Sequence, residues 1–194
     1  MKCLVVMAHP VDNSLCGYLT ARVIEHLRDA GHEVVLKNLY ADAFEPRLSK
    51  AERLSYYARE FNAEKLVADI EQLQAAEMLV LVFPTWWFGF PAMLKGWFDR
   101  VWAPGYAYKH AVDNGAIVPH LSGLKHLYVV TTLGSAWWVD WLVVWRPISR
   151  ILRFAIVGTC AKNCKLKVMS LYGCENLDER RVERFVDRVK KTIG

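Results

Sequence analysis

Short runs of branched apolar residues alternate with segments of helical periodicity along almost the whole chain, and this alternation constrains the fold most. The first run, Lys2 to Ala8, is apolar on both of its alternating faces, as in a strand buried on both sides. Four more runs are strand-like: Glu33–Asn38, Met78–Phe83, His126–Thr132 and Leu166–Tyr172. Strands that alternate with helices typically form a parallel sheet.

Between these runs the apolar residues recur at helical spacing. In the first such segment, Leu15, Leu19, Val23 and Leu27 share one helix face, and Gly31 supplies a C-terminal stop. The expected helical segments are Ser14–Ala30, Ser49–Gln74 (one or two helices, with Ser49 and Glu52 as a capping box), Pro91–Val101, Val139–Val157 (bent or broken at Pro147) and Leu177–Ile193. The sequence therefore predicts an α/β fold: one domain over residues 1–194, a doubly wound five-stranded parallel sheet with helices on both faces.

Composition narrows the class of protein. The chain has a net charge of +5, but its basic residues are scattered and form no nucleic-acid motif, so no nucleic-acid partner is expected. Cys160 and Cys164 lack the further ligands of a metal site, and no metal is expected. An odd number of cysteines and the lack of a signal peptide favour a cytoplasmic protein. Ala136–Val157 carries too many charges to be inserted stably in a membrane.

Ligands of doubly wound sheets bind beyond the carboxyl ends of the strands, near the switch point of strand order. Three loops follow candidate strands there. His9–Cys16 leads into a helix whose first-turn N–H groups suit a phosphate, although a plain N-capped helix explains it as well. Thr131–Trp138 offers two hydroxyls, then Gly and Ser.

The loop after the third strand is the most unusual. It reads Phe-Pro-Thr-Trp-Trp-Phe-Gly-Phe-Pro over residues 83–91. The consecutive rings of Trp86, Trp87 and Phe88 cannot all face one core in any regular element, which favours a wall for a flat ligand over an aromatic corner of the core.

These residues resemble a known family, the flavodoxin-like NAD(P)H:quinone oxidoreductases, which includes DT-diaphorase and bacterial ancillary oxidoreductases of potassium efflux. The strongest match is FPTWWFGFPAMLKGWFDRVW, residues 83–102, which is close to the family pattern FP-x-x-WFG-x-PA-x-LKGWFDRV. Ala8-His9-Pro10 with Ser14 resembles the first phosphate loop of the family, Thr131-Thr132-x-Gly134 its TTGG loop, and Gly105–Tyr108 its GFAY segment.

The resemblance implies a flavin cofactor, FAD or FMN, held by the three loops. The cofactor-binding residues implied are His9, Ser14, Leu15 and Cys16 around the phosphates, Pro84, Thr85, Trp86, Trp87 and Phe88 along the isoalloxazine, and Thr131, Thr132, Leu133 and Gly134 at its pyrimidine side. The implied substrate pocket holds Tyr106, Tyr108, Trp137 and Trp138.

The activity implied is hydride transfer from NAD(P)H through the flavin to a quinone or similar small acceptor, by a ping-pong mechanism. Hydride transfer needs no protein acid or base, so no catalytic residue is assigned. The resemblance also implies a homodimer with active sites at the interface. An alternative from a different class is a flavin-binding ancillary or regulatory subunit of a membrane transport system.

The chain departs from the family pattern at several positions. Cys16 stands where members often have Asn, Leu133 replaces a glycine so that a side chain is expected near the flavin, and no Tyr or His follows the TT loop. Arg146 is the nearest positive charge in that stretch. The Trp-rich stretch that replaces them, read as an amphipathic helix, suits a dimer interface, an apolar substrate channel or a membrane surface. Asp178, Arg180 and Arg181 suit either the adenosine end of FAD or a charged first helical turn.

Overall fold

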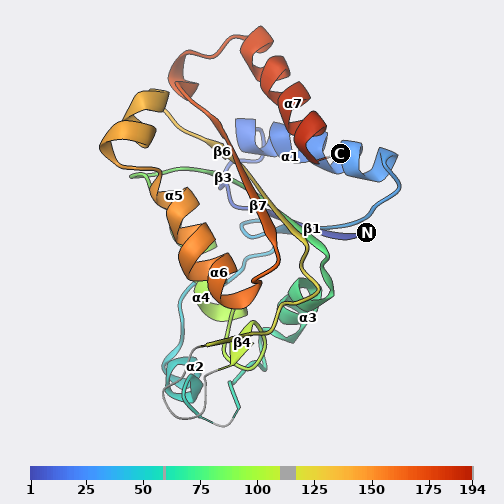
Figure 1. Ribbon diagram of the computed structural model, residues 1–194, viewed down its shortest axis with the longest axis vertical. Helices are drawn as coiled ribbons and strands as arrows, with labels where there is room; N and C mark the ends of the chain where they lie inside the picture. The colour runs from blue at the N-terminus through green and yellow to red at the C-terminus, as the bar shows by residue number, and fades with distance from the viewer. Residues whose placement is uncertain (59, 110–116, 194) are drawn as a thin grey trace.

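A parallel sheet with the strand order β2-β1-β3-β6-β7 forms the centre of the computed structural model, which describes residues 1–58, 60–109 and 117–193 (Figure 1). The strands are β1 (Lys2–Met7), β2 (Glu33–Asn38), β3 (Met78–Pro84), β6 (His126–Thr132) and β7 (Lys165–Leu171). All four pairings are parallel. The predicted five-stranded, doubly wound sheet is confirmed, and β2 and β6 have the predicted bounds.

Helices cover both faces of this sheet. One face carries α1 (Leu15–Asp29) and α7 (Glu179–Ile193), and the other carries α3 (Val67–Ala75), α4 (Ala92–Val101) and the segment from α5 to α6 (Figure 1). Each face has its own apolar cluster. Leu19 and Val23 of α1 pack with Phe185 and Val189 of α7 in one cluster. Trp97 of α4 belongs to the larger cluster on the other face. The central strands β1, β3 and β6 are therefore buried on both sides, as their apolar sequences require, whereas the edge strand β2 is partly exposed.

Local signals explain where several helices begin and end. Ser14 caps α1 by accepting a hydrogen bond from the Gly17 N–H, and Gly31 follows the helix with φ of +77°. The predicted capping box of Ser49 and Glu52 is present at α2 (Lys50–Ser55). The predicted segment Ser49–Gln74 is thus two helices, α2 and α3.

The Trp-rich stretch is broken at Pro147, as predicted, but the segments on either side of the break do not form the regular amphipathic helix that was expected. It consists of a π-helical turn η2 (Val139–Val143), the short α5 (Pro147–Arg150), a π-helical segment η3 (Ile151–Val157) and α6 (Gly158–Cys160). Trp145 and Arg146 both have positive φ, 54° and 52°, and the chain turns there before Pro147 starts α5. A left-handed pair cannot continue a right-handed helix.

The segment over residues 103–122 contains a small hairpin. The strands β4 (Tyr108–Lys109) and β5 (Val118–Pro119) pair antiparallel, and the residues between them include 110–116, which lie outside the described residues. A short 3₁₀ turn, η4 (Cys174–Asn176), connects β7 to α7. Among the described residues, no helix is long and apolar enough to cross a membrane.

Candidate functional site

The three loops predicted from the sequence meet at one edge of the sheet. They leave the carboxyl ends of β1, β3 and β6, which are adjacent strands. The Ala8 N–H donates to Val82 O at 3.0 Å, and the Thr85 N–H donates to Thr132 O at 2.8 Å. The Thr85 and Thr131 hydroxyls are also hydrogen-bonded, 2.7 Å apart. The main chain thus links each loop to the next.

The first loop presents the start of α1. Ser14 Oγ already accepts from Gly17 N at 3.1 Å, which leaves the first-turn N–H groups of Leu15 and Cys16 without an intrahelical acceptor. The Gly17 position lies against the Asp12 carbonyl, so that a Cβ there would overlap this oxygen. The loop therefore curls closely over the helix start, with donors that suit an anion.

Cys16 faces away from this anion site. Its side chain is buried, its Sγ lies 3.8 Å from Thr132 Oγ1, and burial raises the pKa of the thiol to about 11. The thiol is therefore neutral and links α1 to the end of β6. Any contact between Cys16 and a phosphate would be made by its backbone N–H.

The aromatic loop is a tight two-residue turn. Trp86 and Gly89 form an antiparallel bridge closed by a hydrogen bond from Gly89 N to Trp86 O at 2.9 Å. The residues between them, Trp87 and Phe88, have φ of +51° and +55°. Such turns normally use Gly or Asn, and paired non-glycine residues in the left-handed region are strained. Backbone strain of this kind is concentrated at functional sites.

The two tryptophans of this turn point in different directions. The Trp86 ring lies 6.3 Å from the His9 ring, at 54°, and is 43% exposed. Trp87 is completely exposed at the tip of the turn. The structure thus brings Trp86 to the first loop, while Trp87 makes no wall within one chain, and its contact with a ligand stays a prediction.

The third loop is held by the neighbouring strand. The Leu133 N–H donates to Leu171 O at 2.8 Å, and Leu133 O accepts from Cys174 N at 3.0 Å. The Leu133 side chain is 5% exposed, so it fills the interior, in contrast to the expectation that it protrudes near the flavin. A Cβ at Gly134 would lie 3.1 Å from Glu175 Oε1, so Gly134 allows a close approach of these two segments.

The four predicted pocket residues are not all brought to this edge. Tyr106 and Tyr108 lie at the opposite edge of the sheet, where the strands begin. Tyr106 O accepts a hydrogen bond from Gln74 Nε2, at the end of α3 just before β3. In the same segment, Leu121 N donates to the carbonyl of Cys160, just before β7. Trp137 and Trp138 end the third loop and are 58% and 50% exposed. A pocket that contains all four residues would require a second copy of the chain.

A polar network beside the third loop escaped the sequence analysis. The Tyr172 hydroxyl donates to Asp140 Oδ2 at 2.8 Å, the Trp141 Nε1–H donates to the same hydroxyl at 3.2 Å, and the Arg146 guanidinium lies 4.2 Å from the centre of the Trp141 ring. Burial and the bond to Asp140 raise the pKa of Tyr172. The Arg146 guanidinium is thus engaged in a cation–π contact with the Trp141 ring. The hydrogen bonds of Tyr172 hold η2 against the end of β7.

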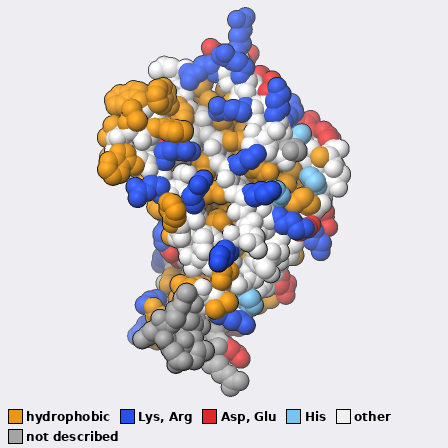
Figure 2. Space-filling model, in the orientation of Figure 1, with side chains coloured by type: hydrophobic (Ala, Val, Ile, Leu, Met, Phe, Trp, Pro, Cys, Tyr) orange, Lys and Arg blue, Asp and Glu red, His pale blue; other side chains and the backbone are white. Residues whose placement is uncertain are grey.

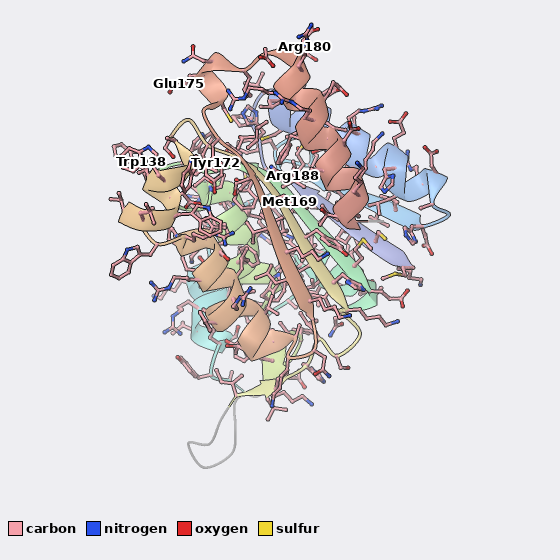
Figure 3. All side chains as sticks on the ribbon, turned by 45° about the horizontal axis from the view of Figure 1, so that its top comes forward. Trp138, Met169, Tyr172, Glu175, Arg180 and Arg188 are labelled. Carbon is pink, nitrogen blue, oxygen red and sulfur yellow. The ribbon has the colours of Figure 1, made fainter. Side chains whose placement is uncertain are left out.

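A groove adjoins this network between η2 and α7. It encloses about 620 Å³ and is lined by aromatic and basic side chains: Trp137, Trp141, Tyr172, Phe185, Arg181, Arg184 and Arg188. Figure 3 shows Tyr172 between Trp138 and Arg188. The recurrence of arginine at 181, 184 and 188 is the sequence signal that would have indicated this basic side of α7.

The residues at the sheet edge fit a phosphate-bearing planar cofactor. The unpaired N–H groups at the start of α1 suit a phosphate, and the half-exposed Trp86 ring supplies an aromatic surface. Next to Gly134, the buried Ser135 hydroxyl oxygen has no hydrogen-bond partner among the described residues, so a donor or acceptor is available there. No group of three or more His, Cys, Asp or Glu residues in the described ranges could hold a metal ion.

Comparisons with known proteins agree with this geometry. A family model described as having a flavodoxin-like fold matches residues 1–189. NAD(P)H dehydrogenase [quinone] 1 of Rattus norvegicus is 32% identical in an alignment of length 179 that covers 79% of this chain and 64% of that protein. An uncharacterized NAD(P)H oxidoreductase of Haemophilus influenzae is 36% identical over 140 residues, 70% of this chain and 65% of that protein.

A solved structure shows the same architecture over nearly its whole length. The NAD(P)H:quinone oxidoreductase of Methanothermobacter marburgensis superposes with a TM-score of 0.81 at 26% identity, covering 98% of this chain and 96% of that one. The curated relatives are longer, and the matched region spans slightly less than two thirds of them.

Proposed function

The chain belongs to the family with a flavodoxin-like fold that matches residues 1–189, and from this premise we propose that it is a flavin-dependent NAD(P)H oxidoreductase. The observation that carries the proposal is the convergence of the three loops at the carboxyl ends of β1, β3 and β6. The names of the relatives, which include NAD(P)H dehydrogenase [quinone], support a quinone or similar small molecule as the acceptor.

In this proposal the bound flavin, FAD or FMN, supplies the chemistry by carrying a hydride from NAD(P)H to the acceptor in a ping-pong cycle. The protein binds and orients. The N–H groups of Leu15 and Cys16 would hold the phosphate, His9 and Trp86 would close the side of the site, and the third loop would bond the polar ring edge. The neutral Cys16 thiol takes no part in the reaction, because burial keeps its pKa near 11.

A homodimer is part of the same proposal. Tyr106 and Tyr108 lie at the opposite edge of the sheet from the three loops. Only a second copy can therefore bring these tyrosines to the site, as the family resemblance implies.

The purified protein is expected to be yellow, with absorbance bands of oxidised flavin. Heat release followed by chromatography would distinguish FAD from FMN, and an acceptor screen with NADH and NADPH would measure turnover. A colourless protein that takes up neither added FMN nor added FAD would contradict the proposal.

Replacing Gly17 by alanine is expected to weaken flavin binding by at least about tenfold, because the new Cβ overlaps the Asp12 carbonyl and displaces the first loop, with loss of hydrogen bonds to a charged group. The loss of stability should be small, since the preference of alanine for the helix, about 1 kcal/mol, offsets part of the strain. Flavin titration and thermal unfolding measure the two effects separately.

Gly123→Ala is the matched control, since no atom lies within 4 Å of a Cβ at that position. Flavin affinity equal in the Gly17→Ala and Gly123→Ala variants would show that the first loop does not hold the cofactor.

A further inference from the structure

The outer edge of β2 has no role in the oxidoreductase proposal. β2 is the first strand in the order β2-β1-β3-β6-β7, and in the described part of the chain it pairs with β1 alone. Val35 and Leu36 at its centre are 39% and 44% exposed. An edge strand of this kind presents N–H and C=O groups to which another strand can bond.

The hydrogen bonds to β1 show which groups of β2 face outward. The N–H groups of Glu33 and Leu39, at the two ends of β2, donate to carbonyl oxygens of the segment that holds β1, at 3.1 and 3.0 Å. The odd-numbered residues therefore direct their main-chain groups to β1. Because these groups alternate along a strand, Val34 and Leu36 direct theirs to the open edge.

The positions that flank these two residues are already bonded within the chain. The His32 N–H donates to Leu27 O at 3.0 Å, and Asn38 O accepts from the Asp42 N–H at 2.9 Å. The open part of the edge is therefore short, and its bounds are set by the turns before and after β2.

The other edge strand of the sheet, β7, is protected against pairing. Lys165 and Lys167 are exposed on it, and the Arg188 guanidinium donates to Ser170 O at 3.2 Å, which occupies a carbonyl of this edge. β7 runs at the front of the sheet in Figure 1, and Figure 2 shows Lys and Arg side chains across that face. Charged side chains of this kind discourage the addition of a strand.

β2 lacks this protection. Its single lysine, Lys37, is directed toward α3, where its ammonium lies 2.8 Å from Asp69 Oδ1. The helices on either side leave space beside the strand: a recess of about 610 Å³ lies between Leu36 and α1, and one of about 240 Å³ lies between Val35 and α3. A further strand therefore has room beside β2.

We propose that β2 pairs antiparallel with β2 of a second copy, about a two-fold axis at Val35, so that two sheets join into one. In this register Val34 lies opposite Leu36 of the second copy, and each such pair exchanges two main-chain hydrogen bonds. A shift of the register in either direction would place His32 or Asn38 opposite an outward-facing residue, and main-chain groups of both are already bonded.

The side chains complement one another in the same register. Residues 33–37 read Glu-Val-Val-Leu-Lys, so Val35 meets its own copy at the axis, and Glu33 lies opposite Lys37 of the second copy. The ion pairs among the described residues include none made by Glu33. The edge thus matches a reversed copy of itself in main-chain groups, apolar contacts and charge, which favours a second copy over a strand of a different protein.

This contact is separate from the homodimer proposed at the flavin site. Residues 33–38 include none of those assigned to the flavin or to the substrate pocket. Their open edge lies at the side of the sheet, whereas the three loops lie beyond the ends of β1, β3 and β6. The two contacts can therefore coexist, and a flavin-site dimer would double into a tetramer. The proposal does not depend on flavin chemistry, and its tests do not measure turnover.

Disulfide cross-linking tests the register. Val35→Cys would place two thiols opposite each other in a non-hydrogen-bonded pair, where the Cα atoms are about 4.5 Å apart and a disulfide can form. Mild oxidation with copper phenanthroline is expected to convert most of this variant into a covalent dimer on a non-reducing gel. Leu36→Cys is the matched control, because residue 36 lies opposite Val34 of the second copy and its thiols stay apart. The wild type, with its native cysteines, should not cross-link.

Sedimentation velocity over a series of concentrations tests the strength of the contact. The mass of the wild-type assembly is expected to double as the concentration rises. Val35→Lys sets two ammonium groups opposite each other at the axis and should weaken this association at least about tenfold. Leu36→Pro should do the same, because it removes an outward N–H from each copy and leaves the bonds to β1 intact. Leu54→Lys, at an exposed apolar residue of α2, adds the same charge and should associate like the wild type.

Three results would overturn the proposal. The first is a wild-type mass equal to that of Val35→Lys at every concentration, including the case in which β2 binds a strand of a different protein instead. The second is a covalent dimer formed equally by Leu36→Cys. The third is equal weakening of the association in Leu54→Lys. Thermal unfolding of Val35→Lys and Leu36→Pro separates a lost contact from a lost fold, and Val35→Cys reports on the register without adding charge.

Discussion

Replacing Arg100 by methionine is expected to lower the free energy of unfolding by about 3–5 kcal/mol, because it leaves the buried Glu52 carboxylate without its cation. Arg100 and Glu52 are 4% and 5% exposed. Arg100 Nε donates to Glu52 Oε1 at 3.0 Å, and a second guanidinium nitrogen donates to Glu45 O. Arg100 thus ties α4 to the start of α2 and to the loop before it.

Urea unfolding measures this effect, and the chain offers a matched control. Arg47 pairs with Glu45 at the surface, where its side chain is 85% exposed, so Arg47→Met should change stability little. The double variant Arg100→Met/Glu52→Leu should recover part of the loss, because no buried charge is left unpaired. Equal stabilities of Arg100→Met and Arg47→Met would show that the buried pair contributes nothing.

The same pair predicts the direction of an acid transition. Burial alone would raise the pKa of Glu52, but hydrogen bonds from Arg100 and from the Ser49 N–H outweigh it and hold this pKa below its usual value. The contribution of Glu52 to stability is therefore fully present above about pH 4.3, the ordinary value for a glutamate, and is lost as the pH falls through the lowered pKa. Unfolding of Glu52→Gln should accordingly depend less on pH in this range.

Gly96→Ala is expected to destabilise the protein by about 1–3 kcal/mol, although alanine normally favours a helix. The Cβ would overlap the carbonyl oxygen of Pro46 and lie 2.6 Å from its Cα. These are backbone atoms of the loop between β2 and α2, which cannot rotate away as a side chain could. The loop would have to move from α4, and the Arg100 hydrogen bond to Glu45 O would be strained as well.

Thermal or urea unfolding of the Gly96→Ala and Gly123→Ala variants measures this loss of stability by comparison. A Cβ at Gly123 meets open space, so that variant should be as stable as the wild type. If Gly96→Ala were equally stable, the loop at Pro46 would have to be more adaptable than its packing indicates.

The central strands were predictable because burial on both faces leaves an apolar signature in the sequence, whereas the edge strand Glu33–Asn38 is only partly buried. His126–Thr132 and Glu33–Asn38 begin and end at the predicted residues. Convergence of the three loops followed from the predicted parallel arrangement, since parallel strands end at one edge of the sheet. Pro147 predicted the break in the Trp-rich stretch, but not the left-handed backbone of Trp145 and Arg146, because neither residue favours that conformation.

Side-chain directions at the site were less predictable than its location. Cys16 points into the interior and Trp87 into solvent, and these directions depend on the N-cap of α1 and on the turn at Trp87 and Phe88. The basic groove was missed for another reason. Its arginines come from α7 and its aromatic residues from η2, about 40 residues apart in the chain, and no local pattern joins them.

The pairing of α1 with α7 on one face of the sheet has a consequence for synthesis of the chain. Leu19 and Val23 are covered by Val186 and Val189, which the ribosome adds more than 160 residues later. Until α7 emerges, the outer flank of α1 and the nearby strands expose apolar surface to the cytosol of any expressing cell. Nascent chains should therefore depend on chaperones until α7 emerges, and should become protease-resistant only once it has docked.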